Sequence, residues 1–117
     1  MNWGSDVIDW SRVSELHEEV GDDALGEVLE LFSSEVAEGL ARLAQANSAT
    51  AIAAEFHFLK GAALNLGLDE VAQICAKGEE NARNGVMTEA QRLAVTEQFP
   101  ASCQELSSQW RDRIGAN

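Results

Sequence analysis

The residues best suited to chemistry are close together in one segment, where Lys60 and Gly61 follow His57 by three and four residues. An imidazole is a nucleophile near neutral pH, and in a helix a lysine three residues later lies beside it. Its ammonium group favours a neutral imidazole and would pair with a dianion attached to the ring. A glycine inside a helix costs about 1 kcal/mol relative to alanine, which indicates that something must approach closely there. These are the requirements of a phosphohistidine.

The position of His57 on its helix indicates that the imidazole faces outward. On a helical wheel His57 lies about 140° from the centre of an apolar stripe. That stripe consists of Ile52, Phe56, Leu59, Ala63 and Leu66. Ala53 and Ala54 lie one turn before His57, so the backbone of a partner could come close to the ring. The same spacing also fits an ordinary solvent-exposed histidine and lysine, and the spacing alone does not decide between the two interpretations.

Apolar residues recur at intervals of three and four throughout the chain, which predicts an all-α fold. We expect helices over residues 10–20, 25–43, 50–66, 69–84 and 88–114. Asp9 or Ser11 is a candidate N-cap for the first helix, and glycines 21, 67 and 85 are candidate stops. Four long amphipathic helices with short loops favour one domain over residues 1–117. We expect an antiparallel up-down four-helix bundle, with the short N-terminal helix capping one end.

Two further local features concern the last helix. Thr88 and Gln91 have the spacing of a capping box at its start. Pro100 should kink or divide this helix, because proline removes a backbone hydrogen bond and clashes with the preceding turn.

Composition excludes several classes of partner. The chain has 117 residues, with 8 Lys and Arg against 20 Asp and Glu, and its net charge of −12 repels nucleic acids and anionic membranes. The sequence has no apolar run of about 20 residues and no signal-peptide pattern, so we expect a cytoplasmic protein. It also lacks nucleotide-binding loops and metal-ligand spacings, so we expect no ATP site, no metal and no cofactor.

The remaining reactive or aromatic residues have structural interpretations. Cys75 and Cys103 are far apart, which predicts two buried, reduced thiols. His17 lies among glutamates without a following Lys-Gly pair, which predicts a solvated surface histidine. The tryptophans are expected to pack the ends of the bundle; they are Trp3, Trp10 and Trp110.

The segment over residues 55–68 resembles the signature of histidine-containing phosphotransfer (HPt) domains. It has the pattern His-x-Leu-Lys-Gly, followed by small residues and then Leu-Gly. The resemblance covers most of the chain. Upstream and downstream it includes Ile8, Asp9, Trp10, Leu29, Leu31, Phe32, Leu40, Val71, Cys75 and Glu79. Two departures stand out: alanines at 62 and 63 replace frequent serines, and Gly78 replaces a large apolar residue.

The resemblance implies a role for each matching residue. His57 would be the phosphoryl acceptor, Lys60 would assist electrostatically and Gly61 would give the partner steric access. Glu79, on the following helix, would orient the imidazole or Lys60. Because Gly78 stands where the family has a large apolar residue, we expect looser packing around Glu79.

The resemblance also implies that the protein is a phosphorelay intermediate rather than an enzyme with its own kinase activity. Its partners would be response-regulator receiver domains and a hybrid sensor kinase. Mg²⁺ would belong to the receiver. We expect a monomer with a docking patch of small and apolar side chains: Ala53, Ala54, Phe58 and Leu64. For Phe58 and Leu64, packing against the first or last helix is an equal alternative. The alternative function is an adaptor bundle that binds a receiver or kinase without chemistry.

Overall fold

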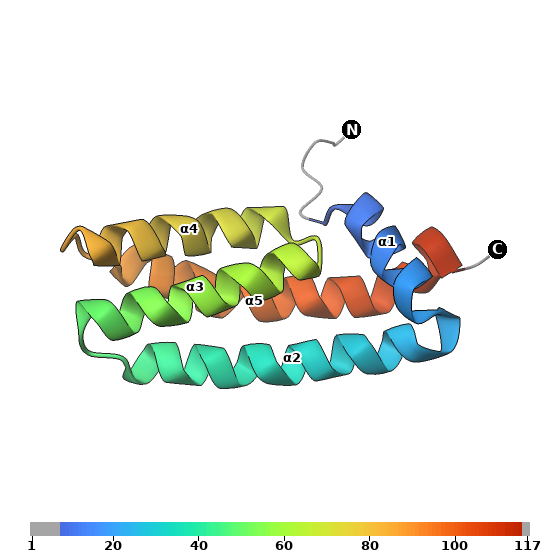
Figure 1. Cartoon of the computed structure of the whole chain (residues 1–117), viewed down its shortest axis with the longest axis horizontal. Helices are drawn as coiled ribbons and strands as arrows, with labels where there is room; N and C mark the ends of the chain where they lie inside the picture. The colour runs from blue at the N-terminus through green and yellow to red at the C-terminus, as the bar shows by residue number, and fades with distance from the viewer. Residues whose placement is uncertain (1–7, 116–117) are drawn as a thin grey trace.

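The computed structural model describes residues 8–115, and this part of the chain is helical without any strand (Figure 1). The predicted all-α class is therefore confirmed. The helices are α1 (Trp10–Val20), α2 (Asp22–Gln45), α3 (Ala49–Asn65), α4 (Asp69–Arg83), α5 (Glu89–Trp110) and the π-helix η2 (Arg111–Gly115). Among the described residues, none of these helices is both long enough and apolar enough to cross a membrane.

The four long helices lie side by side along the longest dimension of the molecule (Figure 1). Helix α2 contacts α3 and α5, and α4 contacts the same two helices. Their facing sides bury the apolar stripes that the sequence predicts on α2 and α5. The inward residues include Leu25, Leu29, Val36, Leu43, Val95, Phe99, Leu106 and Trp110. This core holds α3 and α4 against each other, and the candidate site lies across these two helices.

Local interactions explain where α1 and α3 begin and end. The Asp9 side chain accepts hydrogen bonds from the backbone N–H groups of Ser11 and Arg12, and thereby caps α1. The Ser48 hydroxyl does the same for α3 at the N–H of Ala51. After α3, Gly67 has a φ of 76°, and a Cβ atom there would lie 2.7 Å from the Asp9 carbonyl oxygen. A glycine is therefore needed in this turn for both conformation and space.

One prediction for the last helix is wrong, and one alternative of another does not occur. The Thr88 side chain makes no cap hydrogen bond, and the Gln91 side chain instead accepts one from Asn81 at the end of α4. Tertiary contact has thus replaced the capping box. Pro100, predicted to kink or divide this helix, does not divide α5, which runs unbroken from Glu89 to Trp110, and the kink stays a prediction.

The capping helix α1 is attached to the turn between α3 and α4. The backbone N–H of Asp9 donates to the Gly67 carbonyl at 2.6 Å, and Arg12 Nε donates to the Asn65 carbonyl at 3.1 Å. At the same end of the molecule, Trp110 is buried and Trp10 is partly buried against the core. Both pack this end as predicted, whereas Trp3 lies outside the described residues.

Both cysteines are buried and free, as the sequence predicts. Burial raises the pKa of the Cys75 thiol to about 12 and also raises the pKa of Cys103. A thiol with so high a pKa stays protonated at neutral pH and behaves as a small apolar side chain.

Candidate functional site

The outer face of α3 presents His57 to solvent. The neighbouring residues Phe56 and Leu59 have no exposed surface, and their burial fixes the rotation of the helix about its axis. His57 stands on the opposite side and is exposed. Its position therefore follows from the apolar stripe of α3, as the helical wheel predicts.

Glu79 on α4 connects the chemical groups of the site. His57 Nδ1 lies 3.1 Å from Glu79 Oε2, and Lys60 Nζ donates to Glu79 Oε1 at 2.8 Å. Glu79 is buried although it is charged. Burying a carboxylate costs several kcal/mol unless it is paired and hydrogen-bonded. The pairing with both His57 and Lys60 places Glu79 where the family resemblance implies.

A third donor reaches the same carboxylate from α4 itself. Arg83 Nη2 donates to Glu79 Oε2 at 2.6 Å. Sequence reasoning did not identify Arg83, although its spacing of four residues from Glu79 is the signal of an ion pair along a helix. Lys60 and Arg83 together place two cations on one buried carboxylate.

The charge state of Glu79 determines how the imidazole is protonated. The hydrogen bond from Lys60 holds the pKa of the Glu79 carboxyl below its usual value of 4.5, against the opposing effect of burial. Glu79 is therefore ionised at neutral pH and can only accept hydrogen bonds. It follows that His57 Nδ1 carries the proton of the neutral ring. The lone pair then resides on Nε2, the nitrogen that does not contact Glu79.

Around His57 the face is open and built of small or apolar side chains. A Cβ atom on Gly61 would meet no other atom within 4 Å, so the packing of this chain does not require the glycine. Ala54 and Leu64 are exposed, which excludes burial of Leu64 against another helix. The prediction for Ala53 is wrong: it is buried although it lies about 100° from the centre of the apolar stripe, because a neighbouring helix covers this edge of α3.

The fourth predicted docking residue, Phe58, is partly exposed on the flank of α3 that faces α2. Its ring lies beside Gly39, and the guanidinium group of Arg42 covers it at 5.0 Å from the ring centre. Phe58 thus packs on α2 rather than on the first or last helix.

Gly78, which departs from the family pattern, has a specific partner in the core. A Cβ atom at this position would lie 2.5 Å from the Phe56 ring. The large side chain that packs between α3 and α4 is therefore supplied by Phe56, and Gly78 makes room for it. The glycine does not loosen the support of Glu79, because the space beside it is filled.

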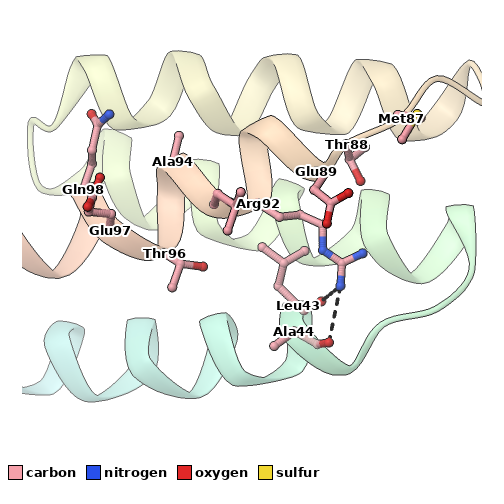
Figure 2. A pocket seen from close by; sticks show the side chains of 11 residues that line it. Leu43, Ala44, Met87, Thr88, Glu89, Arg92, Ala94, Thr96, Glu97 and Gln98 are labelled. Carbon is pink, nitrogen blue, oxygen red and sulfur yellow. Dashed lines mark hydrogen bonds between the residues drawn. The ribbon is translucent and has the colours of Figure 1, made fainter.

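A surface hollow of about 870 Å³ lies away from these residues, between the end of α2 and the start of α5 (Figure 2). Arg92 extends across it and donates to the carbonyl groups of Leu43, Ala44 and Ala46 at 2.7, 3.3 and 3.2 Å. These carbonyls lie at the end of α2, where backbone acceptors lack the partners that the next turn of a helix would supply, and only Leu43 also accepts from the Ala46 N–H. Arg92 therefore has a structural role as a cap, and none of the predicted site residues lines this hollow.

Within residues 8–115, no group of three or more His, Cys, Asp or Glu side chains is arranged to hold a metal ion. His17 differs from its prediction as a solvated residue. It is only partly exposed, contacts Asp22 through Nε2 at 2.6 Å, and has its ring centre 5.9 Å from that of Trp110. This contact with α5 depends on the fold of α1 over the end of the bundle.

Comparison with known families matches the Hpt domain to residues 27–113, which is most of the chain and includes His57, Lys60, Gly61 and Glu79. Comparisons with curated proteins and with solved structures gave no significant match. Hpt domains are phosphotransfer carriers rather than kinases, and they interact with receiver domains and kinases. The chain belongs to the Hpt domain family, whose members are phosphotransfer intermediates in two-component phosphorelays.

Proposed function

We propose that Nε2 of His57 is the atom that accepts and donates the phosphoryl group in this phosphorelay protein. The observation that carries the proposal is the contact between Nδ1 and the buried, ionised Glu79. It orients the exposed ring and leaves the lone pair on the outward nitrogen. Membership of the Hpt family favours this function over an adaptor without chemistry.

The proposed transfer requires no proton to leave the histidine. Nε2 attacks the phosphorus of an aspartyl phosphate in line, an N–P bond forms, and the P–O bond to the aspartate breaks with its electron pair. The aspartate leaves as a carboxylate, and the imidazole ring becomes cationic while Nδ1 keeps its proton. Glu79 offsets this positive charge through its bond to Nδ1. Return transfer to another receiver reverses each step.

In this mechanism Lys60 assists electrostatically. Its ammonium group is held on α3 one turn from His57, within 2.8 Å of Glu79 Oε1. The incoming phosphoryl group is a dianion, and attraction to a nearby cation stabilises it more strongly in a partly buried site than in water. Glu79 therefore holds two groups that act on the same phosphorus: the nucleophile and the cation.

We further propose that the receiver docks over Ala54, Gly61 and Leu64 and supplies Mg²⁺, so that this chain acts as a monomer without its own kinase activity or cofactor. The scaffold is proposed to be an antiparallel up-down four-helix bundle capped by α1. The contacts of α2 and α4 with both α3 and α5, together with the short connections, support this topology. The cytoplasmic location expected from the sequence stays a prediction.

The function can be tested with two phosphoryl donors. Phosphoramidate is a small donor that needs no docking, and acetyl-phosphate-charged receiver domains test transfer between proteins. We expect both to add one acid-labile, alkali-stable phosphoryl group to the wild-type protein, detected by intact mass. His57→Gln should remove this label. His17→Gln is the matched control, since His17 is the other of the two histidines, and should keep it.

Two results would contradict the proposal. Persistent labelling of His57→Gln by both donors would place the acceptor elsewhere. Binding of receivers by the wild-type protein without any labelling from either donor would instead support the adaptor function.

A further inference from the structure

Beside His57, on the side of α3 that faces α2, Phe58 and Arg42 form a stacked pair that has no part in the proposed transfer of the phosphoryl group. Phe58 follows His57 in the chain, so it points about 100° further around α3, toward α2. Its ring rests on Gly39, where a Cβ atom would come within 2.9 Å of the ring. The close approach of the ring to α2 therefore requires a glycine at this position.

Arg42, one turn further along α2, holds the Phe58 ring in place. Its guanidinium carbon lies 5.0 Å from the centre of the ring, and its Nε donates to Glu55 Oε1 at 3.0 Å. Stacking of a guanidinium group on an aromatic ring is favourable, because the cation is attracted to the negative face of the ring. Both side chains remain accessible, with 47% of the Arg42 side chain and 38% of Phe58 exposed. The pair is thus ordered before any partner binds, which lowers the entropic cost of binding.

Arg42 also retains hydrogen-bonding capacity. Within the described part of the chain its Nε is bonded, and its two terminal amines make no hydrogen bond. Arg83 and Lys60, on the other flank of the outer face, both donate to Glu79. Lys60 and Arg83 therefore each have a terminal nitrogen bonded to Glu79, whereas neither terminal amine of Arg42 is bonded within the described residues.

The cations around the outer face of α3 contrast with the negative charge of the chain as a whole. The net charge of −12 repels an acidic partner over most of the surface, yet three of the eight Lys and Arg residues lie around the outer face of α3. A carboxylate on a docking receiver is therefore accommodated at this face. An arginine that is held flat on an aromatic ring suits a carboxylate, because its planar donors form paired hydrogen bonds.

We propose that Arg42, stacked on Phe58, is a specificity-determining residue that pairs with a carboxylate side chain of the receiver domain. It would favour receivers that carry Asp or Glu at the facing position and disfavour those that carry Lys or Arg. This proposal rests on the proposed phosphorelay function and adds to it the recognition chemistry on the α2 side of the face. Arg42 acts on docking, whereas His57 and Glu79 act on the transferred group.

Charge reversal tests the proposal, with Arg42→Glu compared against Arg113→Glu. Arg113 is a matched control because its guanidinium group also stacks at 5.0 Å on an aromatic ring, that of Trp10, at the capping end of the molecule. Both variants change the charge equally and remove one such stack. The measurements are the second-order rate constant of transfer from charged receivers and the rate of labelling by phosphoramidate.

For receivers that phosphorylate the wild-type protein, we expect Arg42→Glu to slow transfer by about tenfold or more, and Arg42→Lys to slow it less. The ratio of receiver transfer to phosphoramidate labelling should fall by the same factor. Arg113→Glu should stay within about twofold of wild type in both assays, since rim charges elsewhere do not meet the receiver. A receiver variant with the facing Asp or Glu changed to Lys should recover transfer with Arg42→Glu.

Results that contradict the role of Arg42 differ from results that contradict the proposed phosphorelay function. Wild-type transfer rates for Arg42→Glu with every receiver would overturn the role of Arg42 and leave His57 as the acceptor. Equal loss of phosphoramidate labelling would assign Arg42 to the site itself, contrary to a docking role. Absence of transfer from any receiver to the wild-type protein, with phosphoramidate labelling retained, would overturn receiver exchange and this proposal with it.

Discussion

Two histidine–carboxylate pairs in this molecule are opposite in burial. In the pair on α3 and α4, the His57 side chain is 67% exposed and the Glu79 side chain is 8% exposed. In the pair at the capping end, the values are 23% for His17 and 60% for Asp22. The shorter contact, 2.6 Å, belongs to the capping end, and the pair on α3 and α4 measures 3.1 Å.

The comparison shows that proximity to a carboxylate does not by itself leave a histidine exposed. A buried carboxylate with fixed partners holds an exposed imidazole in one orientation and leaves its second nitrogen accessible. An exposed carboxylate beside a partly buried imidazole connects two helix ends and presents no nucleophile. The predictions below test this difference, beginning with the largest expected effect.

The largest effect on stability is expected at Gly78, where α4 packs against the Phe56 ring of α3. Gly78→Ala would place a Cβ atom 2.5 Å from the Phe56 ring, which is fully buried. An approach this close belongs to the upper part of the usual cost of overpacking, about 2–3 kcal/mol, against a gain of about 1 kcal/mol for alanine over glycine in a helix. We expect a net loss of about 1–2 kcal/mol in the free energy of unfolding, measured by urea denaturation. Unchanged or increased stability would show that Phe56 can move.

Removing the buried Glu79 carboxylate should slow phosphorylation of His57, whereas removing the Asp22 carboxylate at the capping end should not. Glu79→Ala frees the imidazole to rotate, so we expect phosphoramidate labelling of His57 to slow by about tenfold or more. Glu79→Gln should slow it less, because the amide oxygen still accepts from Nδ1. Asp22→Ala is the control and should label at the wild-type rate. Equal rates for Glu79→Ala and Asp22→Ala would remove the distinction between the two pairs.

Titration of Glu79 should appear in the pH dependence of stability. Its pKa is lowered in the folded protein, chiefly by the hydrogen bond from Lys60. The stabilisation is therefore complete above the usual value of 4.5 and is lost as the pH falls through the lowered pKa. We expect the free energy of unfolding of the wild type to fall more steeply than that of Glu79→Gln between about pH 5 and about pH 3. Parallel curves for the two proteins would show that the ion pairs of Glu79 contribute nothing to the stability of the fold.

Substitution of Gly61 by alanine should stabilise the protein, whereas the same substitution at Gly78 should destabilise it, although both glycines lie inside helices. With no atom within 4 Å of the added Cβ, Gly61→Ala should raise the free energy of unfolding by about 0.5–1 kcal/mol. It should also slow transfer from receivers more than labelling by phosphoramidate, since the methyl group stands where a partner approaches. A variant that is more stable and transfers at the wild-type rate would contradict the access role.

The smallest effect is expected at the capping end. Asp22→Ala removes an exposed partner of His17 at the first residue of α2. Exposed ion pairs contribute about 0.2–1 kcal/mol, so thermal or urea unfolding should shift only slightly. A loss larger than that of Gly78→Ala would mean that the capping end, and not the α3–α4 packing, dominates stability.

Sequence reasoning identified His57, Lys60 and Gly61 as candidate site residues because all three lie on one helix, with Lys60 and Gly61 three and four residues after His57. It placed Glu79 near the site only through family resemblance, since a spacing of 22 residues carries no local signal. Arg83 and Arg42 were missed for a similar reason. Their importance comes from Glu79 and Phe58, which tertiary packing brings to them.

The sequence by itself determined the helices and the outward position of His57. Apolar periodicity, the Asp9 cap and the stops at Gly21 and Gly85 act through interactions within a few residues, and these survive unchanged in the folded protein. Only the tertiary structure decided the burial of Ala53, the loss of the Thr88–Gln91 capping box and the space that Gly78 leaves for Phe56. These depend on which helix faces which, a choice made by complementary packing between residues far apart in the chain.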